Sequence, residues 1–180
     1  SCIVLPGTHS KWVQIENGRI VRFTTYLTGE LFAVLSKHSI LGRLMPESSA
    51  DQSEPDASAF QLGLATAQAS QPGDFPHQIF GTRTLGLTGR LPPASLADYL
   101  SGLLIGHELV SGLAGFDETA PVPLIMIGDP ALCQRYARSL HSFGKSASAV
   151  LDNTAPVGLW ALAHAAGLLQ QSEDHGAHDV

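Results

Sequence analysis

Cysteine is scarce in this sequence, and so are charged side chains and long apolar runs. The two cysteines, Cys2 and Cys133, are too few and too far apart for a disulfide framework or a zinc site. No apolar run approaches the roughly 20 residues that span a bilayer, and the positive residues are scattered singly. With a formal net charge of −6, this composition argues against nucleic acid or an anionic membrane as the main partner. We therefore expect a cytoplasmic protein with two reduced thiols.

The sequence also has no initiator methionine and begins inside an apparent strand, as a piece of a longer protein would. Its length of 180 residues and its hydrophobic fraction of 44% suit one domain with a real core. Only 14% of the residues are charged, so we expect part of the surface to be covered by a partner or by missing chain. The sequence predicts one domain over residues 1–170, a polar tail over 171–180, and an N-terminal domain that is missing.

Three antiparallel strands and a helix are predicted near the start of the chain. "CIVLP" is typical of a buried strand, and it is followed by the alternating segments "WVQI" and "RIVRFTTYL". Asn17-Gly18 between these two segments is the strongest short-range signal for a hairpin, because both residues tolerate positive φ. Thr28 can cap the helix that follows.

Helices dominate the middle of the chain, and strands return near its end. Residues 40–115 predict a helical excursion, in which Ser95 caps a long helix with one apolar face. "PLIMIG" and "SASAVL" then predict two strands, each followed by a helix; Asp129 caps the first of these helices and Gly144 ends it. The order β-β-β-α, a helical insertion, then β-α-β-α predicts an α/β fold with a mixed sheet.

The polar turn "PGTHSK", residues 6–11, separates the first two predicted strands and carries groups that bind phosphate. The helix-opening phosphate loop leads from Gly-Lys-Ser/Thr into a helix, whereas Lys11 leads into a strand. A turn between antiparallel strands can still direct successive N–H groups inward as an anion cradle. Gly7 allows close approach of the backbone, while Thr8 and Ser10 add hydroxyl donors. Lys11 would add its charge if it folds back over the turn; an ordinary exposed hairpin turn is the alternative.

Other segments carry weaker signals for a site. "IMIGDP" places Gly128 at the end of a strand and Asp129 at the start of a helix, where α/β folds place ligands. "TGE" puts the carboxylate of Glu30 in the first turn of a helix, where it complements the helix dipole or contacts a ligand. His9 is either an acid or base near the turn or a surface residue. Two further histidines are expected to be hydrogen-bonded core residues: His107 and His164.

The chain resembles one known family over nearly its whole length, from about Cys2 to Leu169. "LPGTHSKWVQIENGRIVRFTTYLTGELFAVLSKHSILG" resembles the 2-dehydro-3-deoxygalactonokinase family, in which PGTHxKWV and TGEL followed by HS-(I/L)-(I/L)-G recur. "LPPASLADYLSGLLIGHEL", "IMIGDPALCQRYARSL" and "DNTAPVGLWALAHA" resemble later segments of that family. The resemblance implies the C-terminal domain of a kinase of the actin, hexokinase and sugar-kinase superfamily, with an RNase-H-like (actin-like ATPase) fold.

The resemblance also implies a reaction, namely ATP-dependent phosphorylation of the C6 hydroxyl of 2-dehydro-3-deoxy-D-galactonate with the help of Mg²⁺. It implies ATP phosphates at Gly7, Thr8, His9, Ser10 and Lys11, a nucleoside at Gly128, Asp129 and Ala131, and cleft contacts at Thr28 and Glu30. The family's N-terminal domain should supply the general base, so no catalytic residue and no protein ligand for a metal is assigned within residues 1–180.

Two alternatives to an active kinase half remain open. The chain could be a nucleotide-binding or interaction domain of the same fold that catalyses nothing, or a purely structural half with an ordinary hairpin turn. The apolar helices predicted over residues 95–112 and 155–169 could also serve an interface, so a homo-oligomer is compatible with the sequence.

Overall fold

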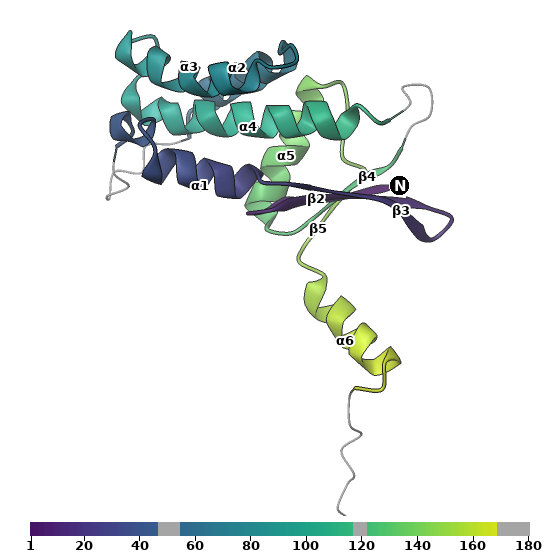
Figure 1. Ribbon diagram of the computed structural model, residues 1–180. Coiled ribbons are helices and arrows are strands. Elements are labelled where there is room, and N and C mark those ends of the chain that lie inside the picture. Colours follow the sequence, from purple (N-terminus) through teal and green to yellow (C-terminus); the bar gives the residue numbers. More distant parts are fainter. Residues whose placement is uncertain (47–54, 117–121, 169–180) are drawn as a thin grey trace, which may run out of the picture.

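The computed structural model describes residues 1–46, 55–116 and 122–168, so the predicted tail over 171–180 lies outside the described residues. Its centre is a five-stranded mixed sheet with the strand order β3-β2-β1-β4-β5 (Figure 1). The strands are β1 (Cys2–Leu5), β2 (Ser10–Glu16), β3 (Arg19–Tyr26), β4 (Leu124–Ile127) and β5 (Ala149–Leu151). β1 pairs antiparallel with β2 and parallel with β4, and β5 pairs parallel with β4. The predicted mixed α/β sheet is therefore confirmed.

The β2–β3 hairpin turns at Asn17-Gly18, as predicted. The φ angles of these residues are 49° and 72°, which is the backbone conformation that a tight hairpin turn requires at both central positions. β2 begins at Ser10, earlier than the predicted start at Trp12. The connection between β1 and β2 is therefore the short turn over residues 6–9, which we call the β1–β2 turn.

Helices cover the sheet and build a layer beside it. Within the described residues these are α1 (Thr28–His38), α2 (Ala57–Gln68), α3 (Phe75–Leu87), α4 (Leu96–Leu113), α5 (Pro130–Ser142) and α6 (Ala155–Ala165), with short 3-10 segments η1 (Gly42–Leu44) and η2 (Pro93–Ser95). In Figure 1, α4 runs through the middle of the helical layer with α2 and α3 on the side away from the sheet. α5 lies between α4 and the sheet, and it contacts both β4 and β5.

α4 is buried on several sides, which is more than the single apolar face that its sequence predicted. α2 approaches it so closely that a Cβ on Gly102 would lie 2.0 Å from the carbonyl oxygen of Phe60. Leu103 packs with α2, whereas Leu109 packs with the sheet and α5. Val110, which the helical spacing placed on the apolar face, is 38% exposed. The prediction was too narrow because α1, α2, α3 and α5 all contact this helix.

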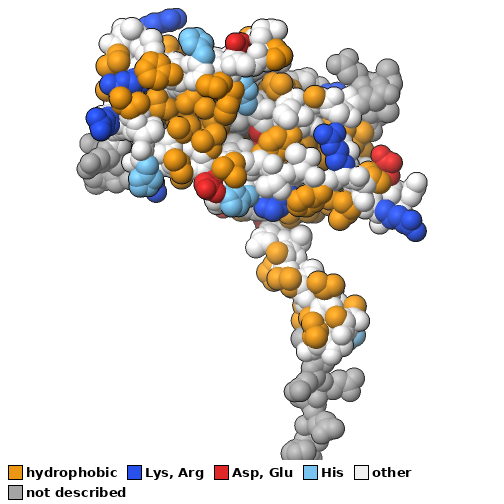
Figure 2. Space-filling model, in the orientation of Figure 1, with side chains coloured by type: hydrophobic (Ala, Val, Ile, Leu, Met, Phe, Trp, Pro, Cys, Tyr) orange, Lys and Arg blue, Asp and Glu red, His pale blue; other side chains and the backbone are white. Residues whose placement is uncertain are grey.

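α6 contrasts with α4, because none of its residues is buried. It extends away from the sheet and the helical layer, and Figure 2 shows its apolar side chains standing apart from the main body. Val157 is 73% exposed and Trp160 is 62% exposed. His164 is exposed and stacks on Trp160, with 5.4 Å between the ring centroids, so the expectation of a core histidine is wrong here. None of the helices in the described ranges has the length and hydropathy of a membrane span.

The predicted helix caps have different outcomes. Asp129 caps α5 as expected, because its side chain accepts a backbone N–H of the first turn at 2.8 Å. Thr28 does not cap α1: it is the first helical residue, and its hydroxyl donates instead to Glu108. Ser95 precedes α4 but makes no capping bond, since its hydroxyl donates to the Asp56 carboxylate at 2.6 Å. Both hydroxyls therefore link separate parts of the chain.

Candidate functional site

The start of α1 packs directly on the β1–β2 turn. The backbone N–H of Glu30 donates to the carbonyl oxygen of Thr8 at 2.9 Å. A Cβ at position 29 would lie 2.5 Å from the carbonyl oxygen of Gly7, which is closer than any side chain allows, so Gly29 is required by this close approach. The turn and the "TGE" segment, which sequence analysis considered separately, thus form one structural unit.

The outer surface of this unit carries charged side chains. His9 Nε2 contacts the carboxylate of Glu30, and both side chains are nearly half exposed. Lys11 folds back as its predicted role required, because its Nζ donates to the carbonyl oxygen of His9 at 2.6 Å. The turn therefore presents one fixed ammonium group and a histidine–carboxylate pair at its surface.

Ser10 lies on the inner side of the turn and is fully buried. The backbone N–H of Gly7 donates to its Oγ at 3.4 Å, and the same Oγ lies 3.2 Å from the hydroxyl oxygen of Tyr136. The side chain thus faces the interior, so its hydroxyl supports the turn from below. Ser10 was expected to add a hydroxyl donor to the anion cradle, whereas its buried hydroxyl contacts Gly7 and Tyr136 instead.

Below the turn, Tyr136 of α5 donates to the carboxylate of Glu108 of α4 at 2.8 Å. Trp12 of β2 donates its Nε1–H to the same carboxylate at 2.8 Å, and the hydroxyl of Thr28 donates to it as well. Burial, and then the negative charge of Glu108, raise the pKa of Tyr136 above its ordinary value. Tyr136 therefore keeps its proton and remains a donor to Glu108.

A cavity of about 430 Å³ opens beside the β1–β2 turn. Among its lining residues are Gly7 and Thr8 from the turn, Thr28 and Gly29 from α1, and Arg135 from α5. His9, Ser10, Lys11 and Glu30 do not line it. The structure thus divides the predicted phosphate residues into two that face a cavity and three that lie beside it or beneath it.

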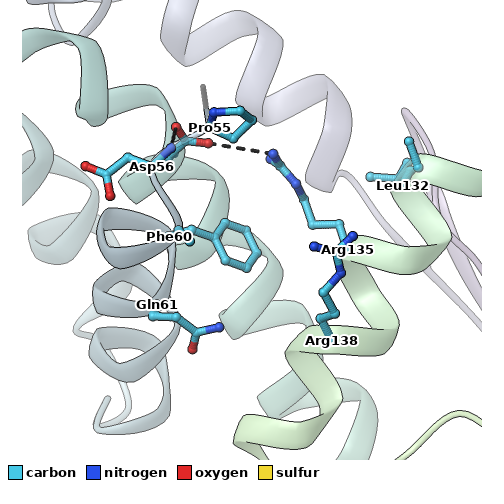
Figure 3. A pocket seen from close by; sticks show the side chains of 10 residues that line it. Pro55, Asp56, Phe60, Gln61, Leu132, Arg135 and Arg138 are labelled. Carbon is cyan, nitrogen blue, oxygen red and sulfur yellow. Dashed lines mark hydrogen bonds and ion pairs between the residues drawn. The ribbon is translucent and has the colours of Figure 1, made fainter. Parts of the chain in front are cut away.

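A second cavity of about 600 Å³ lies between the start of α2 and α5. Figure 3 shows Phe60 and Gln61 of α2 facing Arg135 and Arg138 of α5 across it. Leu132 and Arg135 line both cavities, so the two spaces meet at these side chains. The two cavities therefore lie side by side, and we refer to them together as the cleft.

Arg135 is held at the junction of the two cavities by several contacts. Its Nη1 donates to the Ser101 hydroxyl at 3.0 Å, and its Nη2 lies 3.6 Å from a carboxylate oxygen of Asp98. The guanidinium also lies over the ring of Phe60, 5.1 Å from its centroid. A charged group fixed in this position can contact an anionic ligand that extends through the cleft.

The second predicted site lies at the same edge of the sheet as the turn. β1 and β4 are parallel neighbours, so their carboxyl ends meet, and a Cβ at Gly128 would lie 3.5 Å from the carbonyl oxygen of Pro6. Gly128 has a φ of 149°, which favours glycine at this position. Ala131 lines the larger cavity, whereas Gly128 and Asp129 line neither cavity, and Asp129 caps α5. The fold therefore brings Gly128 close to the β1–β2 turn and places Ala131 at the cleft.

Sequence analysis missed Arg135, Tyr136 and Glu108. Arg135 has no distinguishing motif, and Tyr136 lies among the apolar residues of "ALCQRYARSL". Glu108 offered a usable signal, because it is an acidic residue within the apolar segment "LSGLLIGHELV". His107, its neighbour, is hydrogen-bonded as predicted but only half-buried: its Nε2 lies 2.7 Å from the side-chain oxygen of Gln78, and partial burial lowers its pKa from the ordinary value.

This chain is similar to known proteins of one family. A family model described as 2-keto-3-deoxy-galactonokinase matches residues 1–162. The chain is 35% identical over 166 residues to the 2-dehydro-3-deoxygalactonokinase of Escherichia coli (strain K12), a match that covers 92% of this chain and 54% of that protein. It is 34% identical over 164 residues to a protein of Rhizobium meliloti (strain 1021) named "Probable 2-dehydro-3-deoxygalactonokinase DgoK1", covering 91% of this chain and 52% of that protein. The chain spans about half the length of these curated relatives.

A solved structure shares the arrangement of these elements. It is the crystal structure of a candidate 2-dehydro-3-deoxygalactonokinase from Sinorhizobium meliloti, which superposes with a TM-score of 0.74 at 29% identity. The match covers 93% of this chain and 55% of that chain.

Proposed function

Because this chain belongs to the 2-keto-3-deoxy-galactonokinase family, we propose that it forms the C-terminal, RNase-H-like (actin-like ATPase) part of a cytoplasmic ATP-dependent sugar-acid kinase. The substrate is 2-dehydro-3-deoxy-D-galactonate, and the acceptor is its C6 hydroxyl. The relatives' names support a kinase of this sugar acid. The observation that carries the proposal in this chain is the cleft, whose two neighbouring cavities lie beside the β1–β2 turn and between α2 and α5.

The β1–β2 turn is the proposed place for the ATP phosphates. Gly7 and Thr8 line the smaller cavity, where a backbone without a side chain and an exposed hydroxyl can approach phosphate oxygens. Lys11 is held over the turn by its bond to the carbonyl oxygen of His9 and offers a positive charge nearby. Ser10 fixes the shape of the turn from the inside. His9 contributes through its pairing with Glu30 at the outer rim.

The larger cavity is the proposed place for the nucleoside. Gly128 keeps the end of β4 open, Asp129 orients α5 through its cap, and Ala131 lines the cavity with a small side chain. Phe60 and Arg135, which contact each other at the wall of this cavity, offer an apolar ring and a cation. A nucleoside triphosphate with its nucleoside in the larger cavity would extend its phosphates past Arg135 toward Thr8.

In the proposed reaction, the bond from the γ-phosphorus to its bridging oxygen breaks while the C6 oxygen of the sugar acid bonds to the phosphorus. The C6 hydroxyl proton passes to a general base, and ADP leaves. Such transfers depend on positioning and on stabilising charge at the phosphate oxygens. Thr8 and Lys11 of this chain serve that need, and Thr28 and Glu30 border the site where the acceptor would approach.

Mg²⁺ supplies charge neutralisation of the phosphates in such reactions. In the part of the chain that the structure describes, no three His, Cys, Asp or Glu side chains gather into a group able to hold a metal ion. In this proposal, ATP phosphates, water and groups outside this chain would hold the ion. The general base has the same proposed origin, an N-terminal domain that is not part of these 180 residues.

The exposed apolar side chains of α6 support such a second domain. Val157, Leu159, Trp160 and Leu162 are 62–73% exposed along one short helix. Several large apolar side chains exposed on one element usually mark an interaction surface. Covering them with the remainder of a protein about twice this length would explain their exposure, and we expect the isolated chain, without that remainder, to be inactive as a kinase.

The test is ADP release from Mg-ATP by the full-length protein, with 2-dehydro-3-deoxygalactonate and its gluconate epimer side by side. Thr8→Val should lower kcat roughly 10²-fold, which is the scale for removing one transition-state hydrogen-bond donor. Thr88→Val makes the same change at an exposed residue that lines neither cavity, and it should leave kcat within twofold. ATP binding without turnover of either sugar acid would favour the non-catalytic nucleotide-binding alternative, and full activity of Thr8→Val would refute the phosphate assignment.

A further inference from the structure

Glu108 is an acidic residue in the core, only 3% exposed, beneath the proposed phosphate site. Its carboxylate accepts hydrogen bonds from three donors: Trp12 at 2.8 Å, Tyr136 at 2.8 Å, and the hydroxyl of Thr28. None of the ion pairs within the described ranges includes Glu108. The carboxylate is therefore satisfied by hydrogen bonds from neutral groups.

Burying a carboxylate in the core costs free energy. Removal from water disfavours the charged form, and hydrogen bonds only offset that cost. An apolar side chain of similar volume would pack against the core residues Trp12 and Tyr136 without this penalty. The acid at this position thus suggests a role that an apolar residue could not perform.

The three donors come from the segments that flank the β1–β2 turn. Trp12 belongs to β2, which leaves the turn, and Thr28 is the first residue of α1, which packs on the turn through the adjacent Gly29. Tyr136 belongs to α5 and connects Glu108 to Ser10, whose Oγ accepts the N–H of Gly7. Both supports of the turn, from below and from α1, therefore converge on one carboxylate.

We propose that Glu108 is a positioning residue for phosphoryl transfer, whose carboxylate holds the β1–β2 turn and the start of α1 in the arrangement that receives the ATP phosphates. The proposal rests on the function proposed above. Glu108 itself touches no reacting atom, and it acts through Ser10 and Thr28.

The carboxylate matters because it can only accept hydrogen bonds. It sets the direction of a series of hydrogen bonds, in which the Ser10 hydroxyl donates to Tyr136 and the Tyr136 hydroxyl donates to Glu108. This leaves a lone pair of Ser10 Oγ to accept the N–H of Gly7. A carboxamide in the same place must keep its oxygen toward the Trp12 N–H and turn its NH₂ toward Tyr136. Tyr136 would then donate to Ser10, and the proton of the buried Ser10 hydroxyl would lose its acceptor.

The test compares wild type, Glu108→Gln and Tyr136→Phe in the full-length protein. Tyr136→Phe removes the connecting hydroxyl and keeps the ring, so it serves also where Glu108→Gln fails to fold. Ser139→Ala is the matched control, because it deletes a fully buried hydroxyl of the same helix that donates to the carbonyl oxygen of Arg135. The measurements are the Kd for Mg-ATP, the KM values for ATP and for the sugar acid, kcat, and hydrogen exchange of the peptide covering residues 7–11.

We expect Glu108→Gln to raise the Kd and KM for ATP about tenfold and to lower kcat up to about 10²-fold, since small misplacements of reacting groups have effects of this size. The KM for the sugar acid should stay within twofold. Exchange of the 7–11 amides should become faster in both variants and remain unchanged in Ser139→Ala. A merely structural role would reduce the amount of folded enzyme without separating the two KM values.

The outcomes separate this proposal from the function on which it rests. If wild type binds Mg-ATP and turns over the sugar acid while both variants keep its KM for ATP and its exchange rates, the positioning role is refuted and the kinase assignment stands. If wild type binds no ATP, the kinase assignment fails and the positioning role in phosphoryl transfer fails with it, whatever the exchange rates show.

Discussion

Gly29→Ala should separate α1 from the β1–β2 turn. The added Cβ would lie 2.5 Å from the carbonyl oxygen of Gly7 and 2.8 Å from the Cα of Thr8. Both of these atoms belong to the backbone, so neither can rotate away as a flexible side chain would. Ordinary contact begins at 3.4 Å, and reaching it requires a relative movement of about 0.9 Å. A shift of this size would strain the 2.9 Å bond from the Glu30 N–H to the Thr8 carbonyl.

The magnitude follows from the two effects of this shift. Overpacking of a close contact costs about 1–3 kcal/mol of stability. Displacement of the turn by about 1 Å can cost up to about 10²-fold in rate when it misplaces a reacting group. We therefore expect a lower urea midpoint of the full-length protein, a KM for ATP raised about tenfold, and a KM for the sugar acid that changes little.

Gly81→Ala is the matched control for this prediction. It makes the same chemical change within α3, where no other atom lies within 4 Å of the added Cβ, so it should stabilise the protein by up to about 1 kcal/mol. Gly29→Ala protein with the stability and the KM for ATP of wild type would refute the reasoning, because it would show that α1 does not constrain the turn.

Two further predictions concern ionisable groups. Hydrogen bonds from the Ser95 hydroxyl, and then from the Ala59 and Ser58 N–H groups, lower the pKa of Asp56 below its ordinary 3.8. The stabilisation that this carboxylate provides is therefore complete well above pH 3.8, and it is lost as the pH falls through the folded-state pKa. Thermal unfolding of wild type and Asp56→Asn between pH 6 and pH 3 should therefore show a difference that shrinks toward pH 3; a constant difference would contradict it. Burial raises the pKa of Cys2 to about 11, and burial followed by the charges of Asp129 and Asp152 raises that of Cys133. At pH 8 iodoacetamide should modify either cysteine only after urea is added. Rapid labelling of the native protein would contradict the burial and the raised pKa values of the two thiols.

The sheet was predictable because its signals are local. Alternation, a buried apolar run and Asn17-Gly18 are each contained within a few residues, and strand pairing follows from the connections. The caps were less predictable, since a hydroxyl before a helix has more than one available acceptor. Thr28 and Ser95 donate to carboxylates that lie 80 and 39 residues away in sequence, and no local pattern contains that information. Asp129, whose acceptor role is fulfilled within its own turn, was predicted correctly.

The candidate site likewise has some features that are local in the sequence and others that depend on residues far away in the chain. The composition of the β1–β2 turn is a local property, so Gly7 and Thr8 were identified from the sequence, and the structure places both at a cavity. The inward direction of Ser10 depends on Tyr136, which is 126 residues away. Arg135 gains its position from Ser101 and Phe60 on two other helices. Single-sequence reasoning identifies residues whose chemistry suits a phosphate, whereas tertiary packing decides which of them line a cavity.

In the proposed phosphate site, a turn between strands takes the place of a loop that opens a helix. The usual phosphate loop continues into its own helix, whose N-terminus contributes a partial positive charge. Here β2 follows the turn, but the first turn of α1 is brought against it by the contact of Gly29 with Gly7 and by the Glu30 N–H bond to Thr8. The positive end of a helix is thus placed beside the turn by packing across the chain. Because that placement depends on α1 and not on continuity of the backbone, changes at Gly29 should alter phosphate affinity even though every residue of the turn itself is unchanged.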